Sequence, residues 1–67
     1  MTICKQYTHG KERIEITLYD NGRYFIDYGV TYTATGMRYY NSSAGYFCTL
    51  ETAQAVLQMH RPGAKEI

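Results

Sequence analysis

The stretch from Glu12 to Tyr28 carries the strongest folding signal in the chain. Up to Leu18, apolar residues alternate with polar or charged residues, which is the period-2 pattern of a strand with one buried face. The segment Asp20–Gly22 follows, and its residue types tolerate the positive φ angles that a tight hairpin turn needs. The stretch therefore predicts two antiparallel strands joined by a short turn, around which the other segments assemble.

The length of the turn decides which residues pair. A two-residue turn would place Asp27 opposite Ile16, on the apolar face. A three-residue turn, with Gly22 as the left-handed bulge residue, keeps that face apolar, whereas a slip by one residue would expose it. We therefore predict the bulged turn, with the pairs Leu18–Tyr24, Ile16–Ile26 and Ile14–Tyr28, and with Tyr19 and Phe25 on the opposite face beside Arg13, Thr17 and Arg23.

The segments on either side of this hairpin predict shorter strands. Residues Met1 to Tyr7 read as a first strand, and Thr8 to Lys11 as a turn in which His9 is solvated. After the hairpin, Gly29 indicates a bend. Beyond it we expect an extended segment at 30–33, a turn at 35–36, a strand at 37–40, a polar loop at 41–45 and a short strand at 46–48.

A helix is predicted from Leu50 to about His60. Thr49 has the side chain of an N-cap residue, and Pro62 prevents the helix from continuing. The tail from Ala64 to Ile67 is expected to add an edge strand. One face of the helix is apolar apart from its last residue, and it comprises Leu50, Ala53, Val56, Leu57 and His60.

These elements predict an α+β fold, an antiparallel β-sheet of three to five strands with one C-terminal helix packed on one face. An isolated hairpin is marginal in water, so the helix is needed to bury the apolar face. The whole chain, 1–67, is expected to be a single domain, with the sheet at about 2–48, the helix at about 50–60 and the tail at 61–67.

Size and charge restrict the function. A chain of 67 residues supports only one small core, so a deep substrate cavity would compete with the core for apolar side chains. The net charge of +1 gives no basic stripe for binding a phosphate backbone. No apolar run has the length of a signal peptide or a membrane span. The sequence thus predicts a cytoplasmic protein, in a host cell, that is not an enzyme and does not bind a membrane.

No motif for catalysis or metal binding is present. His9 and His60 lie far apart, and neither stands at ligand spacing from a cysteine or a carboxylate. We expect no metal and no other cofactor. Cys4 and Cys48 are expected to be free, partly buried thiols, with Cys48 a small buried residue at the end of a strand.

The eight tyrosines are the informative feature of the composition. They either fill both faces of a small sheet or form an exposed surface of tyrosine and arginine, the residue types that anchor interfaces. One helix covers one face only, so the other face must be wet, paired in an oligomer or used for recognition. The candidate partner-binding residues are Tyr19, Arg23, Phe25, Arg38, Tyr39 and Tyr40.

The Asp-Asn-Gly hairpin and the passage from Tyr46 to Ala53, an aromatic strand entering a Thr-Leu-Glu-x-Ala helix, resemble a pattern found in small proteins of phages and mobile elements. Several anti-CRISPR proteins look like this. The resemblance extends from Ile14 to Leu57 and is architectural, so it transfers no functional residue. It implies an inhibitor that acts by stoichiometric binding to a protein partner, such as a CRISPR effector or another host defence complex.

The order of three strands and a helix is also similar to the arm-binding domain of tyrosine integrases, whose sheet enters a DNA groove. The matching portions are Asn21–Tyr24 and Phe47–Ala53. The sequence departs from that pattern because only three arginines are available and carboxylates are interleaved with them. DNA binding is therefore the alternative function. A further alternative is a structural or regulatory subunit that pairs by strand addition, as a homodimer or with another chain, at an unpaired edge of the first strand or of the tail Ala64–Ile67.

Overall fold

The predicted hairpin is confirmed by the computed structural model, which describes all residues 1–67. Strand β2, Glu12–Leu18, pairs with strand β3, Tyr24–Tyr28, in the bulged register, with Ile16 opposite Ile26. The Tyr19 amide donates to the Arg23 carbonyl at 3.0 Å, which closes a three-residue turn. Gly22 has a φ of +78°, the left-handed conformation that this turn requires.

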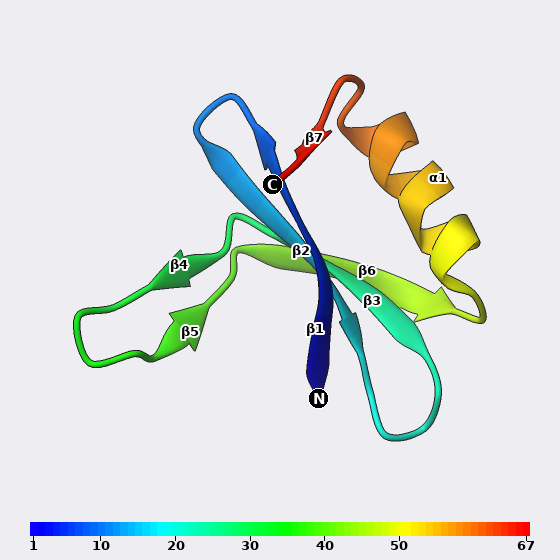
Figure 1. Cartoon of the computed structure of the whole chain (residues 1–67), viewed down its shortest axis with the longest axis horizontal. Coiled ribbons are helices and arrows are strands. Elements are labelled where there is room, and N and C mark those ends of the chain that lie inside the picture. The colour runs from blue at the N-terminus through cyan, green and yellow to red at the C-terminus, as the bar shows by residue number, and fades with distance from the viewer.

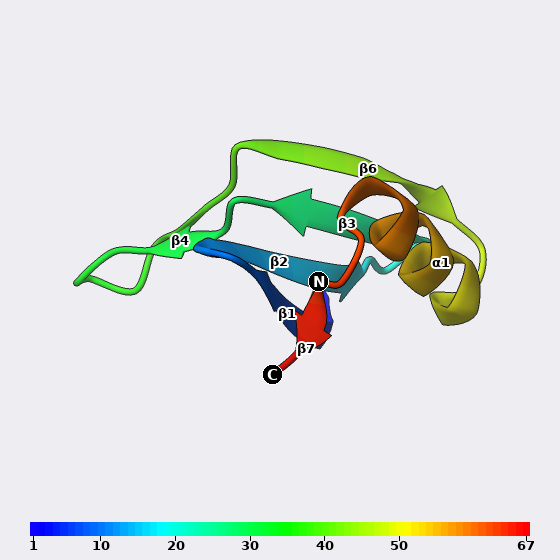
Figure 2. The same cartoon turned by 90° about the horizontal axis from the view of Figure 1, so that it is seen from above.

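Five strands form one antiparallel sheet, and Figures 1 and 2 show how they lie relative to α1. Strand β1, Thr2–His9, lies beside β2, and the short strand β7, Lys65–Glu66, lies beside β1. Strand β6, Ser42–Phe47, pairs with β3 at the other side. The order across the sheet is β6-β3-β2-β1-β7. The predicted α+β class, the antiparallel sheet and the edge strand in the tail are confirmed.

Helix α1, Leu50–His60, covers one face of the sheet and contacts β3 and β6. The Thr49 hydroxyl accepts from the Thr52 amide at 3.2 Å, so the predicted N-cap is confirmed. At the other end the side chain of His60 turns toward the sheet, where its Nδ1 lies 2.7 Å from the Tyr28 hydroxyl. The bounds and the buried face of the helix agree with the periodicity of the sequence.

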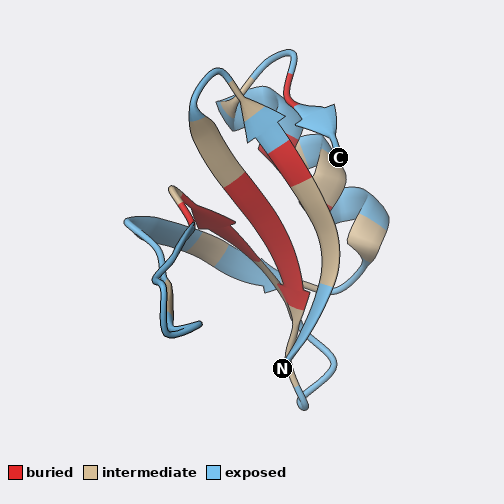
Figure 3. Ribbon diagram, turned by 60° about the vertical axis from the view of Figure 1, so that its left-hand side comes forward, coloured by how far each residue is buried: buried red, intermediate tan, exposed pale blue.

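The core lies between the sheet and the helix. Figure 3 shows that the buried segments run along the middle of β2 and β3, while the strands at the edges are more exposed. Apolar burial of this kind is the main driving force available to a chain of this size. The residues of the core cluster are Tyr7, Ile14, Ile16, Ile26, Tyr28, Ala53, Leu57 and Ala64.

Residues 41–45 were expected to form a polar loop, and this prediction was wrong. Ser42 to Gly45 belong to β6, which continues to Phe47, and Cys48 lies outside the strand. Serine, alanine and glycine favour strands weakly by themselves. The strand forms because its backbone pairs with β3. Residue propensities depend on the side chains alone and do not include this pairing.

The expectation that His9 is a solvated turn residue was also wrong. His9 ends β1, which extends two residues beyond the predicted end at Tyr7, and the turn consists of Gly10 and Lys11. The imidazole Nε2 of His9 lies 3.1 Å from the Pro62 carbonyl oxygen. The segment after α1 thus reaches β1, which explains why a residue near a turn is half-buried.

Between β3 and β6 the chain forms a two-stranded arm. Strand β4, Thr31–Tyr32, pairs with strand β5, Arg38–Tyr39, and the Gly36 amide donates to the Thr33 carbonyl at the tip. Gly29, with a φ of +67°, makes the bend at which the arm leaves β3. Figures 1 and 2 show the arm projecting from one end of the sheet, away from α1.

Candidate functional site

Two carboxylates lie side by side on the face of the sheet opposite α1. Glu15 of β2 and Asp27 of β3 are direct cross-strand partners. They are 0 % and 1 % exposed, so they are buried although no helix covers this face. Two buried carboxylates strongly require compensating charge, because desolvation disfavours their ionised forms.

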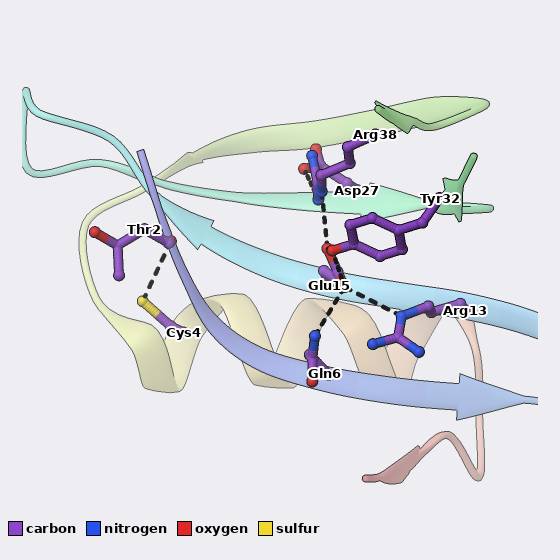
Figure 4. Close-up of polar contacts among 8 residues, drawn as sticks. All are labelled: Thr2, Cys4, Gln6, Arg13, Glu15, Asp27, Tyr32 and Arg38. Carbon is purple, nitrogen blue, oxygen red and sulfur yellow. Dashed lines mark hydrogen bonds and ion pairs between the residues drawn. The ribbon is translucent and has the colours of Figure 1, made fainter. Parts of the chain in front are cut away.

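The compensating charge comes from the arm (Figure 4). Arg38 Nε donates to Glu15 Oε1 at 2.8 Å, and an Nη of the same guanidinium donates to Asp27 Oδ2 at 2.7 Å. The Arg38 side chain is only 13 % exposed. Burial lowers the pKa of Arg38, but the hydrogen bonds to Asp27 and Glu15 outweigh that effect and raise the pKa. Arg38 is therefore a permanent cation that bridges β2, β3 and the arm.

Glu15 accepts hydrogen bonds from three further side chains. The Tyr32 hydroxyl donates at 2.8 Å, Gln6 Nε2 at 3.0 Å and Arg13 Nε at 3.1 Å. Burial raises the pKa of Glu15. The hydrogen bonds from four side chains lower it by more than burial raises it, so the pKa lies below its usual value; the donors are Tyr32, Arg38, Arg13 and Gln6. Glu15 is thus held as a carboxylate that joins β1, β2 and the arm.

This arrangement, the Glu15 cluster, adds a cover that the prediction of a wet, oligomeric or recognition face did not include. Part of that face is covered by the chain's own arm. The cluster comprises the carboxylates of Glu15 and Asp27, the guanidiniums of Arg13 and Arg38, and the side chains of Tyr32 and Gln6. The positive charges and hydrogen-bond donors compensate the two buried negative charges. Its chemistry fixes the position of the arm, and its carboxylates are bound within the fold.

A row of aromatic rings continues along the same face toward β6. The centroids of Tyr19 and Phe25 are 4.6 Å apart, and those of Phe25 and Tyr46 are 4.9 Å apart in an edge-to-face arrangement. Gly45 lies opposite Phe25, and a Cβ at Gly45 would stand 2.4 Å from the Phe25 ring. Because Gly45 has no side chain, the Phe25 ring can lie across β6 and reach Tyr46.

Tyr40 lies at the base of the arm, against Arg38 of the Glu15 cluster. The Arg38 guanidinium lies 5.7 Å from the centre of the Tyr40 ring. The pKa of Tyr19 is raised, first by burial and then by the charge of Asp27. We call Tyr19, Phe25, Tyr40 and Tyr46 the aromatic face. Tyr40 and Tyr46 are 46 % and 71 % exposed, so both of these rings are open to solvent.

Four of the six predicted partner-binding residues come together here. Tyr19, Phe25 and Tyr40 belong to the aromatic face, and Arg38 lies beneath Tyr40 with its guanidinium engaged by Glu15 and Asp27. Tyr39 lies on the opposite side of the arm, where it is 54 % exposed and its hydroxyl contacts Met37 Sδ at 3.8 Å.

The sixth residue, Arg23, is exposed beside the hairpin turn, and its guanidinium contacts Cys48 Sγ. Cys48 itself is exposed, which corrects the prediction of a buried thiol, because β6 ends one residue earlier. Cys4 is half-buried, and neither cysteine forms a disulfide.

Sequence reasoning did not include Tyr46 among the candidates. The aromatic face depends on the pairing of Gly45 with Phe25, and that pairing was hidden while residues 41–45 were read as a loop. A signal was nevertheless present, because a glycine beside an aromatic residue at an edge often accommodates an aromatic ring from the neighbouring strand.

No pocket opens on the surface, and no three His, Cys, Asp or Glu side chains gather where they could hold a metal ion. The one helix has eleven residues, and no helix of the structure is long and apolar enough to cross a bilayer.

Comparison with known proteins found no match among protein-family models, curated proteins or solved structures. The fold and the aromatic face are therefore interpreted from their own geometry.

Proposed function

We propose that this chain is a non-enzymatic binding module that recognises a protein partner through its aromatic face. The observation that supports this most directly is the row of contacting rings Tyr19, Phe25 and Tyr46, together with the exposure of Tyr46 and of Tyr40 at the base of the arm. Tyrosines combine a rigid apolar ring with a polar hydroxyl, and they are enriched at the centres of protein interfaces. The arm beside the row adds exposed Met37 and Tyr39 to the same end of the molecule.

The distribution of charge favours a protein partner over DNA. Arg13 and Arg38 are paired with Glu15, and Arg61 is paired with Glu12 at 2.7 Å. An arginine that neutralises a carboxylate within the fold contributes little to binding a phosphate backbone. DNA recognition, the alternative, would need a basic surface on the open face of the sheet, and that face presents tyrosines.

We further propose that binding is inhibitory and stoichiometric, as in the anti-CRISPR proteins that the chain resembles in architecture. The partner would be a host defence complex in the cytoplasm of the host cell. What supports this is the combination of small size, near-neutral charge and a recognition surface built on a rigid sheet. A protein of this kind acts by occupying a surface of its target, and it needs no active site of its own.

The test is affinity capture from host lysate with the tagged wild-type chain and with the double variant Tyr40→Ser, Tyr46→Ser. Captures are performed with and without nuclease, at low and at moderate salt. We expect the wild type to retain a defined protein complex under all conditions, because a tyrosine-centred interface depends weakly on salt. The double variant should lose that complex, since both exposed rings of the aromatic face are truncated.

The matched control is Ile67→Ser, which truncates a side chain of similar exposure, 66 %, at the opposite edge of the sheet. This variant should capture the complex as well as the wild type does. If both variants captured it equally, the aromatic face would not be the binding site. If only nucleic acid were recovered, and salt removed it, the alternative of DNA binding would replace this proposal.

A further inference from the structure

Strand β6 is an edge strand with no protection by charge. It ends the sheet on one side, and no backbone or side-chain hydrogen bond within the chain reaches its outer edge. Residues 42–47 are Ser-Ser-Ala-Gly-Tyr-Phe, without lysine, glutamate or proline. Natural sheets usually protect such an edge with charges, proline, a bulge or a covering segment, because its unpaired N–H and C=O groups are a template for another strand. Of these, β6 has only the bulge near Gly45 and Tyr46, which leaves residues 42–44 regular.

The other edge of the sheet is protected in these ways. Strand β7 covers β1 there, and Lys5 of β1 forms an ion pair with Glu66 of β7 at 3.2 Å. Lys65 adds another charge to that edge. The contrast between the two edges indicates that the exposure of β6 is specific to that side of the molecule.

An apolar flank of α1 faces the β6 edge. Gln54 donates to the Tyr7 hydroxyl at 3.0 Å and Gln58 donates to the Ala64 carbonyl at 2.8 Å, so that flank of the helix points toward β1 and β7. The opposite flank, at helical spacing, carries Val56, which packs against the core, and Met59, which lies farther out on the solvent side of the same flank. Met59 is 70 % exposed.

The two most exposed of the large hydrophobic side chains thus border the same unprotected edge, Met59 on the helix side and Tyr46 on the opposite side. Exposed apolar side chains that lie singly need no explanation, but apolar groups on both sides of an unpaired strand suggest a contact surface. An added strand would bring its own side chains against both residues.

We propose that a second copy of this chain occupies the β6 edge, with the two β6 strands paired antiparallel about a two-fold axis perpendicular to the sheet. Antiparallel pairing of a strand with itself is isologous, so each contact occurs twice. The small side chains from Ser42 to Gly45 let the two edges approach, and no charge of β6 is brought opposite its own copy. The result is one ten-stranded sheet.

This symmetry places both helices on one side of the joined sheet. Their Val56 and Met59 flanks then face each other across the axis, which adds apolar burial to the backbone pairing. Both aromatic faces lie on the other side, with the two Tyr46 rings near the axis. The partner copy thereby extends the aromatic face, and the dimer stands whether or not that face recognises another protein.

A second copy fits the edge better than a charged partner does. The segment from Ser42 to Phe47 has no charge that could be complemented, whereas its uncharged side chains are compatible with their own copy. The net charge of +1 adds little repulsion between copies. The contact is short, because β6 has six residues and a bulge near Gly45 and Tyr46, so we expect a dimer weaker than an interface of standard size would give.

The test is sedimentation equilibrium of the full chain from micromolar to millimolar concentrations, with amide hydrogen exchange at the same concentrations. We expect a monomer–dimer equilibrium, and slower exchange of amides in 42–46 as the dimer forms. The variant Met59→Lys places like charges across the axis and should weaken dimerisation by more than roughly tenfold. Because Met59 is exposed, this variant should keep the wild-type fold by circular dichroism.

The matched control is Ile67→Lys, which puts the same charge at a residue of similar exposure beside the protected edge. Its dimerisation should equal that of the wild type. A chain that stays monomeric at every concentration would overturn the proposal. A dimer that Met59→Lys does not weaken, or one without slower exchange in β6, would also overturn it.

Discussion

At the scale of single residues, Arg38 has the largest consequence for this fold. Its guanidinium bridges Glu15 and Asp27, which are buried in adjacent strands, and it lies 23 and 11 positions away from them in the sequence. A buried carboxylate that loses its cation keeps the full cost of desolvation, because water cannot reach it. Removing Arg38 alone should therefore lower the free energy of unfolding by far more than the ion pairs contribute to it in the intact protein.

We expect Arg38→Met to lower the free energy of unfolding by about 3–5 kcal/mol, measured by urea denaturation. That loss is comparable with the total stability of a domain of this size. The double variant Asp27→Asn, Arg38→Gln should recover part of it, because it removes one buried charge together with its partner. Arg23→Met, at an exposed position, is the control and should change stability little.

Equal stability of Arg38→Met and Arg23→Met would show that the Glu15 cluster does not support the fold. Failure of the double variant to exceed Arg38→Met would show that Asp27 does not need a cation. Either result would contradict the electrostatic account of the arm.

At the scale of elements, β6 shows how pairing overrides propensity. Four of its six residues are serine, alanine or glycine, which do not predict a strand. Its place beside β3 nevertheless makes the aromatic face, because the missing side chain at Gly45 admits the Phe25 ring. The same element supplies the unprotected edge, so one short strand decides both proposed contact surfaces.

Gly45→Ala should destabilise the protein by about 1–3 kcal/mol, since the new methyl group would overlap the Phe25 ring. In the background of Phe25→Ala the same substitution should cost much less, because the overlapping ring is gone. A double-mutant cycle in urea measures this coupling. Ser43→Ala, two residues earlier on the same strand, is the control and should lie within about 0.5 kcal/mol of wild type.

An additive cycle, in which Gly45→Ala costs the same with and without the Phe25 ring, would show that the ring does not lie across β6. The row from Tyr19 to Tyr46 would then lose its central link.

At the scale of the whole molecule, the sheet has an apolar layer on one face and an ionic layer on the other. α1 buries the first face, and the Glu15 cluster attaches the arm to the second. The two layers respond differently to acid, because the buried carboxylates lie in the ionic layer. The pKa of Glu15 is lowered in the folded protein by hydrogen bonds that exceed the effect of burial.

A lowered carboxylate pKa stabilises the folded state wherever the unfolded chain would already be ionised. Glu15 therefore contributes its full stabilisation at pH values above its unfolded pKa of about 4.5, and this contribution is lost as the pH falls through the lower, folded pKa. We expect the free energy of unfolding to decline on acidification below that value. Urea denaturation at a series of pH values measures the decline.

Glu15→Gln should reduce the acid-dependent slope, even though it lowers stability at neutral pH by weakening the cluster. Glu66→Gln, in an exposed ion pair, should leave the slope nearly unchanged because such pairs contribute little. A wild-type slope that survives Glu15→Gln in full would assign the acid sensitivity to other groups.

The sequence alone determined the elements whose information is local. The alternation from Ile14 to Leu18, the turn at Gly22 and the helix from Thr49 to His60 each follow from residues within one segment, and all three are confirmed. The predicted bulged register also pairs Glu15 with Asp27, because a register that keeps one face of the hairpin apolar sets the pairs on the other face.

Only the tertiary structure decided what covers the second face and which strand completes the sheet. The arm returns over Glu15 because Arg38 and Tyr32 satisfy a buried carboxylate, and β6 forms because β3 offers unpaired backbone groups. These contacts join residues far apart in the chain, and their free energy comes from desolvation and pairing that exist only once the sheet has formed. Within residues 41–45 only Gly45 indicates such a pairing, and the other residue types favour a loop.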